Sequence, residues 1–351
     1  MRDQSVSARP TPPVPPVVKG NMPPLSSPPL DLSPGSVVRQ IPAAIKTMRI
    51  YQWSKNGLVF MALIFAHRLF DLRADLRVLC AFAIFSLTAS TIYIMNDIRD
   101  RDSDRMHPTK RERPIPAGRL ALPVAYGTAA TCTLIAVALM LWLTLSGVTG
   151  PRDFLFGADG SHPLFILTIV GYAAMNIAYT LRLKHEVLWD VFIIAAGFVL
   201  RAFAGALAIP VPISPWFYLC TLFLALFLAL GKRRSELVQL DGKASGQRRI
   251  LEHYSLPLLD QLMGIVVTSA LITYSLYTLQ GDAASHNLLL TIPIVTFGLF
   301  RYLYLIYVHS EGERPDELLW RDKQILGAVT LCVVLYVMLL YGLPWLHAVI
   351  R

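Results

Sequence analysis

The stretch "VLCAFAIFSLTASTIYIMNDIRDRDSD", residues 78–104, decides the fold because an apolar run ends there in a dense group of charges. Residues 78–95 contain no charged side chain. With its flanks, this run approaches the roughly 20 residues that cross a bilayer as an α-helix. Similar runs recur along the chain, and this recurrence predicts an all-α, polytopic membrane protein.

Composition supports the same fold class. The 351-residue chain is 54% hydrophobic and only 16% charged, whereas about a quarter of the residues in a soluble domain are charged. The formal net charge of +9 fits the Lys and Arg excess in the cytoplasmic loops of membrane proteins, so we expect no nucleic-acid partner. Hydropathy predicts nine transmembrane helices, at about residues 52–70, 78–98, 120–147, 163–183, 187–209, 215–231, 257–279, 287–308 and 325–346.

The chain divides into a tail and one membrane domain. Residues 1–40 are rich in proline, which predicts a disordered cytoplasmic tail. This tail lacks the apolar core and cleavage site of a secretory signal. Residues 41–351 hold all the predicted spans, and we expect no soluble domain between them.

Cationic residues predict the orientation of the spans. Lys and Arg gather after spans two, six and eight, whereas the connections after spans three, five and seven hold Arg152 as their only cation. Because cationic loops stay in the cytoplasm, we expect a multi-pass protein of the cell (inner) membrane with a cytoplasmic N-terminus. The connection after span one, "HRLFDLRADLR" (67–77), also carries arginines, and we interpret it as a short interfacial stretch.

Oxygen-bearing side chains cluster at the end of span two. If residues 96–104 are helical, with about 100° per residue, four side chains fall within an arc of about 100°: Asn96, Asp97, Asp100 and Asp104. Asp102 points to the other side. Crowded carboxylates at a membrane edge repel one another, and Mg²⁺ prefers a few carboxylates with water and substrate phosphate. The pattern predicts that these four residues bind Mg²⁺, with Mn²⁺ as an alternative; pairing with nearby arginines is the competing interpretation.

A second acidic pair lies at the predicted cytoplasmic start of span five. Glu186 and Asp190 are spaced i, i+4, which places them on one face if this segment is helical. Their location at the same membrane edge as the first cluster predicts that both face one cavity. Such a cavity suits Mg²⁺ bridged to a diphosphate.

Cations near these acids are candidates for binding phosphate oxygens. Lys110, Arg111 and Arg113 follow the acidic helix directly, in "HPTKRERPIPAG" (107–118). Lys184, Lys232 and Arg233 lie at the same predicted edge, although cytoplasmic orientation alone explains some of these charges. Arg201 lies in the middle of a span, where a charge is costly and indicates a site or packing role.

The sequence resembles the UbiA superfamily of intramembrane prenyltransferases. "NDIRDRDSD" (96–104), followed by "HPTKRERPIPAG", is similar to that superfamily's NDxxDxxxD signature, and Glu186-x-x-x-Asp190 stands in for its DxxxD motif with Glu at the first position. The resemblance implies nine helices around a central cavity open to the cytoplasmic side. It also implies that Asp97, Asp100 and Asp104 are catalytic through a bound metal.

Further segments resemble the decaprenyl-phosphate phosphoribosyltransferase branch of that superfamily. They are "QWSKN" (52–56), "LRLKHEVLWD" (181–190), "VLRAFAG" (199–205), "LGKRRSEL" (230–237) and "GERPDELLWRD" (312–322). This resemblance implies transfer of 5-phosphoribose from 5-phosphoribose 1-diphosphate to a polyprenyl phosphate, with Lys55 and Asn56 also facing the phosphates.

Two other functions stay open. The first keeps the fold but transfers a prenyl group from a prenyl diphosphate to an aromatic acceptor, because the same acidic motif serves both reactions. The second is a membrane transporter, because intramembrane charges such as Arg201 also mark ion pathways. The absence of a visible inverted repeat and the position of the acids at a membrane edge argue against transport.

Overall fold

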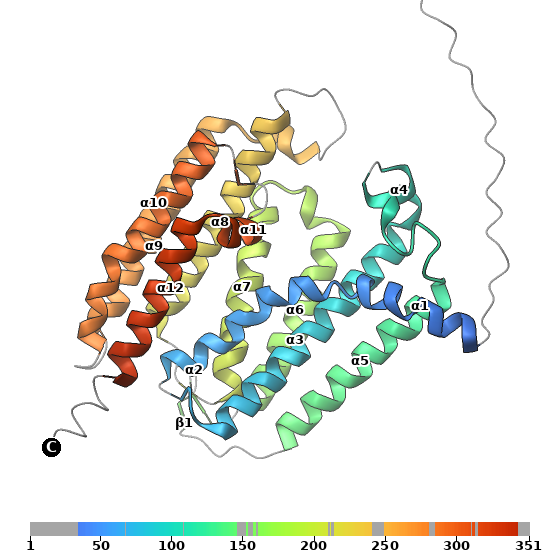
Figure 1. The fold of residues 1–351 in the computed structure, drawn as a ribbon, viewed down its shortest axis with the longest axis horizontal. Helices are drawn as coiled ribbons and strands as arrows, with labels where there is room; N and C mark the ends of the chain where they lie inside the picture. The colour runs from blue at the N-terminus through green and yellow to red at the C-terminus, as the bar shows by residue number, and fades with distance from the viewer. Residues whose placement is uncertain are drawn as a thin grey trace, which may run out of the picture.

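The computed structural model describes residues 34–66, 68–107, 109–145, 152–153, 157–158, 161–209, 211, 214–240, 249–280, 285–309, 311–312 and 315–342. Within them the chain forms a bundle of long helices (Figure 1). Eight of these helices are long and apolar enough to cross a membrane. The predicted all-α, multi-pass class is therefore confirmed.

The elements follow in chain order. The α-helices are α1 (Pro34–Thr47), α2 (Met61–Phe65), α3 (Leu72–Arg99), α4 (Arg101–Met106), α5 (Leu122–Leu145), α6 (Ser161–Leu181), α7 (Trp189–Ala208), α8 (Pro215–Leu240), α9 (Leu256–Gln280), α10 (Ile292–Val308), α11 (Pro315–Arg321) and α12 (Lys323–Val337). The 3-10 segments are η1 (Ile50–Phe60), η2 (Lys110–Glu112), η3 (Leu183–His185), η4 (Arg249–His253) and η5 (Ser285–Thr291), and η6 (Met338–Gly342) is π-helical. Strands β1 (Arg152–Asp153) and β2 (Gly157–Ala158) pair antiparallel between α5 and α6.

The first predicted span, 52–70, is not one continuous α-helix. Its residues form the 3-10 segment η1 and the five-residue helix α2, although 3-10 runs of this length are uncommon. Tertiary packing holds the segment against α7: a Cβ atom at Gly205 would lie only 2.1 Å from the Val59 carbonyl oxygen. Because glycine has no side chain, the backbone of α7 can approach η1 closely at the place where η1 is not an ordinary α-helix.

The start of the described chain also differs from prediction. Helix α1 begins at Pro34, inside the predicted tail of residues 1–40, and residues 1–33 lie outside the described residues. Apolar Val38, Ile41 and Ile45 recur at helical spacing, which favours an amphipathic helix over an extended tail.

Two further boundaries change the setting of charged residues. Helix α3 begins at Leu72, so the second half of the predicted interfacial stretch belongs to a transmembrane helix, and the Asp71 carboxylate caps its first backbone N–H groups. Helix α8 continues to Leu240, so Lys232 and Arg233 lie on a helix and not in a connection.

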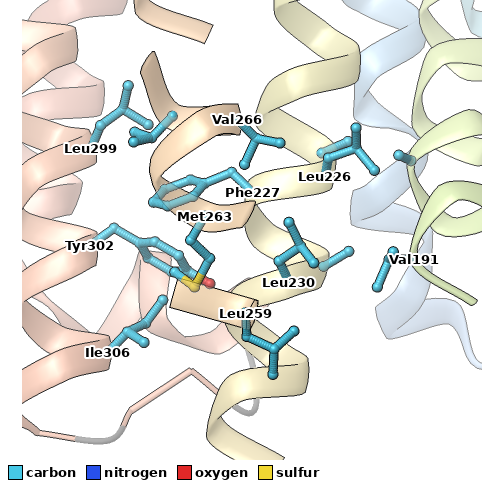
Figure 2. Close-up of a cluster of buried hydrophobic side chains, with 14 of the residues drawn as sticks. Val191, Leu226, Phe227, Leu230, Leu259, Met263, Val266, Leu299, Tyr302 and Ile306 are labelled. Carbon is cyan, nitrogen blue, oxygen red and sulfur yellow. The ribbon is translucent and has the colours of Figure 1, made fainter. Parts of the chain in front are cut away.

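The two largest groups of buried hydrophobic residues pack on either side of α7. On one side Phe227, Met263 and Tyr302 from α8, α9 and α10 pack together (Figure 2). On the other side α3 packs against η1 and α6, where the rings of Phe85 and Tyr172 lie 5.0 Å apart. Helix α7 contacts α8 and α6 as well as α3 and η1, so it joins the two halves of the bundle.

Candidate active site

The acidic segment is a helix with a small break. The backbone N–H of Asp100 donates to the Asn96 carbonyl, and that of Asp104 donates to the Asp100 carbonyl, at 2.8 Å each. Asp97 and Asp104 are buried as a result, although each carries a formal charge. Asp102 faces solvent, as predicted from the helical angle.

Arg113 joins the two buried carboxylates. Its Nη1 lies 3.1 Å from Asp97 Oδ1 and 2.7 Å from Asp104 Oδ2. Lys110 Nζ lies 3.9 Å from Asp104 Oδ1. Two of the three predicted phosphate-binding cations of this loop thus meet the acidic pair, whereas Arg111 is exposed and makes no ion pair with any described residue.

Arg49 completes this cluster, and sequence reasoning did not single it out. Its Nη2 lies 2.5 Å from Asp97 Oδ1, and its guanidinium lies 4.9 Å from the centre of the Tyr93 ring. Its backbone adopts φ 55° and ψ 50°, a left-handed conformation that costs a non-glycine residue roughly 1–2 kcal/mol. Such strain is common at functional sites. The available signal was a cation just before "QWSKN", but nothing local indicates a contact with α3.

The four predicted metal ligands do not converge as one set. Asn96 lines a cavity between α3, α5 and α6, away from Arg113, and Asp100 is half-buried without an ion pair to any described residue. Within the part of the chain that the structure describes, no three Asp, Glu, His or Cys side chains come close enough to hold a metal ion. Of the four predicted ligands, only Asp97 and Asp104 share an ion-pair partner among the described residues, and these two form a buried pair.

The buried pair nevertheless fits a divalent cation. Both carboxylates point at one positively charged group, the Arg113 guanidinium. The position between the two carboxylates therefore attracts positive charge. Mg²⁺ sites commonly use one or two carboxylates and complete the shell with water and substrate phosphate. The two acids therefore match that chemistry, while the roles of Asn96 and Asp100 as ligands stay predictions.

A second charged cluster lies where α7 begins. Arg233 Nε donates to Asp190 Oδ2 at 2.6 Å, and Arg233 also pairs with Glu236. Tyr254 donates its hydroxyl hydrogen to Asp190 Oδ1 at 2.7 Å. Burial raises the pKa of the Tyr254 hydroxyl and the hydrogen bond to Asp190 raises it further, so the phenol remains a donor. Glu236 belongs to the same "LGKRRSEL" segment as Arg233 and pairs with it within α8. Sequence reasoning missed Tyr254, because its contact with Asp190 joins residues 64 positions apart and involves an uncharged side chain.

The predicted common face of Glu186 and Asp190 is wrong. Leu188 adopts φ 67°, and α7 begins only at Trp189, so the i, i+4 spacing does not lie on a helix. Glu186 is 52% exposed and lies 4.0 Å from Arg182, whereas Asp190 is fully buried. Lys184, on the neighbouring 3-10 turn, is half-buried.

Arg201 is held within the bundle by neutral partners. It donates from Nε to Asn56 Oδ1 at 2.6 Å, from Nη1 to the Gly197 carbonyl at 2.7 Å and from Nη2 to the Tyr172 hydroxyl at 2.8 Å. Asn56 in turn donates to Ser86 Oγ at 3.0 Å. This network ties η1 and α3 to α6 and α7, which gives Arg201 the packing role that was one of its two predicted explanations.

The remaining predicted phosphate ligands have different settings. The Asn56 side chain is buried, and its amide accepts from Arg201 and donates to Ser86. Its contact with a phosphate stays a prediction. Arg233 is 1% exposed and doubly paired, which likewise removes it from any open surface. Lys55 and Lys232 are both half-buried and both have interaction partners.

The two charged clusters lie at the same end of the bundle but are separate. Asp97 is near the end of α3 and Asp190 near the start of α7, and these helices pack against each other (Figure 1). Among the described residues, no hydrogen bond or ion pair connects one cluster with the other. A single cavity faced by both acidic groups stays a prediction.

Proteins of known activity resemble this chain over most of its length. It is 32% identical over 295 residues to the decaprenyl-phosphate phosphoribosyltransferase of Mycolicibacterium smegmatis, covering 80% of this chain and 86% of that protein. It is 34% identical over 297 residues to the decaprenyl-phosphate phosphoribosyltransferase of Mycobacterium tuberculosis, covering 82% of this chain and 92% of that protein.

A solved structure shares the fold. The UbiA homolog from Archaeoglobus fulgidus bound to DMAPP and Mg²⁺ superposes with a TM-score of 0.59 at 16% identity, covering 85% of this chain and 98% of that one. The family model of the UbiA prenyltransferase family matches residues 57–320. This match includes Asp97, Asp104 and Arg113 of the first charged cluster and all of the second, and the chain belongs to the UbiA prenyltransferase family.

Proposed function

We propose that this protein transfers the 5-phosphoribosyl group from 5-phosphoribose 1-diphosphate to a polyprenyl phosphate and releases diphosphate. The relatives that are named for this reaction cover four-fifths of the chain. The structural observation that carries the proposal is the buried acidic pair, Asp97 and Asp104, faced by Arg49, Lys110 and Arg113. A site with both signs of charge suits a reaction between two phosphorylated substrates.

The reaction breaks one bond and forms another at the same carbon. A phosphate oxygen of the lipid attacks C1 of the ribose, and the bond between C1 and the diphosphate oxygen breaks, with its electron pair leaving on the diphosphate. The attacking oxygen is already anionic, so no strong general base is needed. Catalysis then consists mainly of aligning the two phosphorylated groups and stabilising the charge on the leaving group.

Asp97 and Asp104 would hold Mg²⁺, with Mn²⁺ as an alternative and with Asn96 and Asp100 as further oxygen donors. When bound, the metal supplies positive charge to the departing diphosphate. Glu186 and Asp190 take no direct part in this proposal, because one is exposed to solvent and the other is paired with Arg233.

The cations at the acidic pair would bind the phosphate groups. Arg113 is 31% exposed and Lys110 45% exposed, so both side chains can exchange a carboxylate for a phosphate oxygen without leaving the site. Arg111 lies on the same turn and can reach the 5-phosphate from solvent. We place this end of the bundle on the cytoplasmic face of the cell (inner) membrane. A soluble phosphosugar has access there, and Lys and Arg side chains are enriched in loops on that face.

The test is transfer by purified protein in lipid nanodiscs. Radiolabelled 5-phosphoribose 1-diphosphate and a polyprenyl phosphate should give a labelled lipid and free diphosphate, and chelation of divalent cations should abolish the product. Mg²⁺ should restore it. Product formed only from a prenyl diphosphate and an aromatic acid would replace this proposal with prenyl transfer, and metal-independent substrate uptake into proteoliposomes would replace it with transport.

A further inference from the structure

A cavity of about 510 Å³ lies between α3, α5 and α6. Along α3 it extends from Ile84 to Arg99, a distance of about 22 Å at 1.5 Å per residue. It therefore runs from the middle of a transmembrane helix to the helix end that carries the acidic pair. Its volume falls within the roughly 300–1,000 Å³ that is typical of ligand sites.

The wall of this cavity is apolar over most of its length. Met140 on α5 and Ile169 and Ile177 on α6 face it. The hydroxyls of Thr91 and Thr133, which also line it, lie 3.2 Å apart and satisfy each other across the α3–α5 contact. A polar ligand would find few hydrogen-bond partners along this wall, whereas a hydrocarbon chain needs none.

The cavity is open on the membrane-facing side of the bundle. Val137 on α5 and Val170 and Ile177 on α6 line it and are also exposed. All three residues lie within helices long and apolar enough to cross a membrane. A lipid chain can therefore enter sideways from the bilayer without passing through water.

The end of the cavity near α4 is polar and cationic. Asn96 and Arg99 line it there, and Arg99 forms no ion pair with any described residue. Asp97 follows Asn96 directly but turns toward Arg113. A phosphate at this end would meet a guanidinium and an amide, and Asn96 is next in sequence to Asp97 of the acidic pair.

We infer that this groove binds the acceptor lipid, with the polyprenyl chain between α3, α5 and α6 and the phosphate at Arg99 and Asn96. The inference rests on the proposed function, because it assigns a location to the acceptor of that reaction. Charge complementarity selects an anionic lipid, and the apolar length selects a long chain. Because lipid tails are as apolar as the groove, little hydrophobic energy drives this binding. The groove instead acts by packing one chain in the orientation that brings its phosphate to the reacting sugar.

The experiment fills the groove from α6 and uses the adjacent residue as a matched control. Ala173 lines the groove, whereas Ala174 is exposed outside it. Ala173→Trp should raise KM for a long polyprenyl phosphate at least about tenfold, a change of about 1.4 kcal/mol, because the indole fills the space in which the chain packs and keeps its phosphate from the end of the groove. KM for 5-phosphoribose 1-diphosphate and turnover of a two-isoprene acceptor should stay within about twofold, and Ala174→Trp should match the wild type in all three.

A binding measurement keeps the test independent of turnover. A polyprenyl phosphate with a photoreactive group in its chain should label α3 or α6 peptides in the wild type. Ala173→Trp should lower that labelling at least about tenfold, because the indole occupies the space in which the chain packs. Unchanged labelling and KM in Ala173→Trp, or equal losses in Ala174→Trp, would overturn the inference. A wild-type protein that makes no phosphoribosyl product but still labels at the groove would instead refute the proposed function alone.

If Ala173→Trp does not fold, the smaller Ala173→Phe is tested in the same assays. Arg99→Gln should weaken labelling by the polyprenyl phosphate but not by the corresponding uncharged polyprenol. Equal labelling by phosphate, polyprenol and phospholipid probes would show that the groove holds any bilayer chain, which also overturns the inference.

Discussion

The two charged clusters at one end of the bundle both pair aspartate with arginine, but they differ in the exposure of the arginine. At the end of α3, Asp97 and Asp104 are buried, but their partner Arg113 is 31% exposed. At the start of α7, Asp190 and its partner Arg233 are both 1% exposed. The first cluster can exchange one cation for another from solvent. The second is closed on both sides and joins α7 to α8.

In the proposed function, this difference separates the reactive site from a structural ion pair. Acidic residues near a membrane edge look alike in sequence. Their function depends on whether the cationic side chain that pairs with them can be replaced by another cation. A buried pair that loses one partner leaves an uncompensated charge, which destabilises the fold. At the first cluster the cations are partly exposed, so the loss of a carboxylate leaves a positive charge that water can solvate. Mutations in the two clusters should therefore affect different measurements.

The largest expected effect is on catalysis at the first cluster. Asp97→Asn should lower phosphoribosyl transfer at least about a thousandfold, because losing a metal-binding carboxylate removes several kcal/mol of transition-state stabilisation. The melting temperature in detergent should change little, since the neutral amide fills the same space. Asp102→Asn is the control and should retain activity, because Asp102 is exposed. Equal losses in both variants would mean that the pair is not the reactive centre.

The second effect is on stability at the second cluster. Arg233→Ala should lower the free energy of unfolding by about 3–5 kcal/mol, because Asp190 is left buried without a countercharge. The measurement is thermal unfolding in detergent. Combining Arg233→Met with Asp190→Leu should recover part of the loss, because the double variant buries no unpaired charge at positions 190 and 233, while Glu236, which loses its partner, is 19% exposed. A folded Arg233→Ala protein that loses only activity would assign this cluster to the reaction.

Sequence reasoning predicted the parts of the fold that depend on local pattern. Apolar runs of bilayer length gave the transmembrane helices, and the angle between residues placed Asp102 outside the acidic pair. It failed where tertiary contacts override local propensity. The 3-10 segment η1 approaches Gly205 of α7 closely, and no local pattern around residues 50–60 encodes that contact.

The predicted site was incomplete for the same reason. Arg113 was found because it follows the acids closely along the chain, whereas Arg49 reaches Asp97 from 48 positions away. The Glu186 error came from assuming a helix through Leu188, where the backbone turns to a positive φ. A hydrophobic residue in that conformation is uncommon, and sequence gives no reason to expect it.

A smaller effect should follow at Tyr254, the neutral member of the second cluster. Tyr254→Phe removes a hydrogen bond to the buried Asp190 carboxylate, and hydrogen bonds to charged groups contribute about 1.5–3 kcal/mol. We expect a fall of this size in the free energy of unfolding. The hydroxyl also accepts from the Leu188 backbone N–H at 2.8 Å, so hydrogen exchange at Leu188 should accelerate. Unchanged exchange there would contradict this role.

The smallest effect concerns a third ion pair of intermediate exposure. Asp322 caps α12 through the backbone N–H groups of Gln324 and Ile325 and pairs with Arg301 at 2.8 Å. Asp322→Ala should cost about 1 kcal/mol of stability through the lost cap. Asp322→Asn should cost less at neutral pH, because asparagine is also a good cap.

This pair also predicts a pH dependence. Hydrogen bonding to Arg301 and to the α12 backbone holds the pKa of the Asp322 carboxyl below its ordinary value. Its contribution to stability is therefore present above the unfolded-state value of about 3.9 and is lost as the pH falls through the lower folded value. The stability difference between the wild type and Asp322→Asn should shrink between about pH 6 and pH 3. A difference that stays constant over this range would show that the Arg301 pair adds nothing, as many exposed ion pairs do.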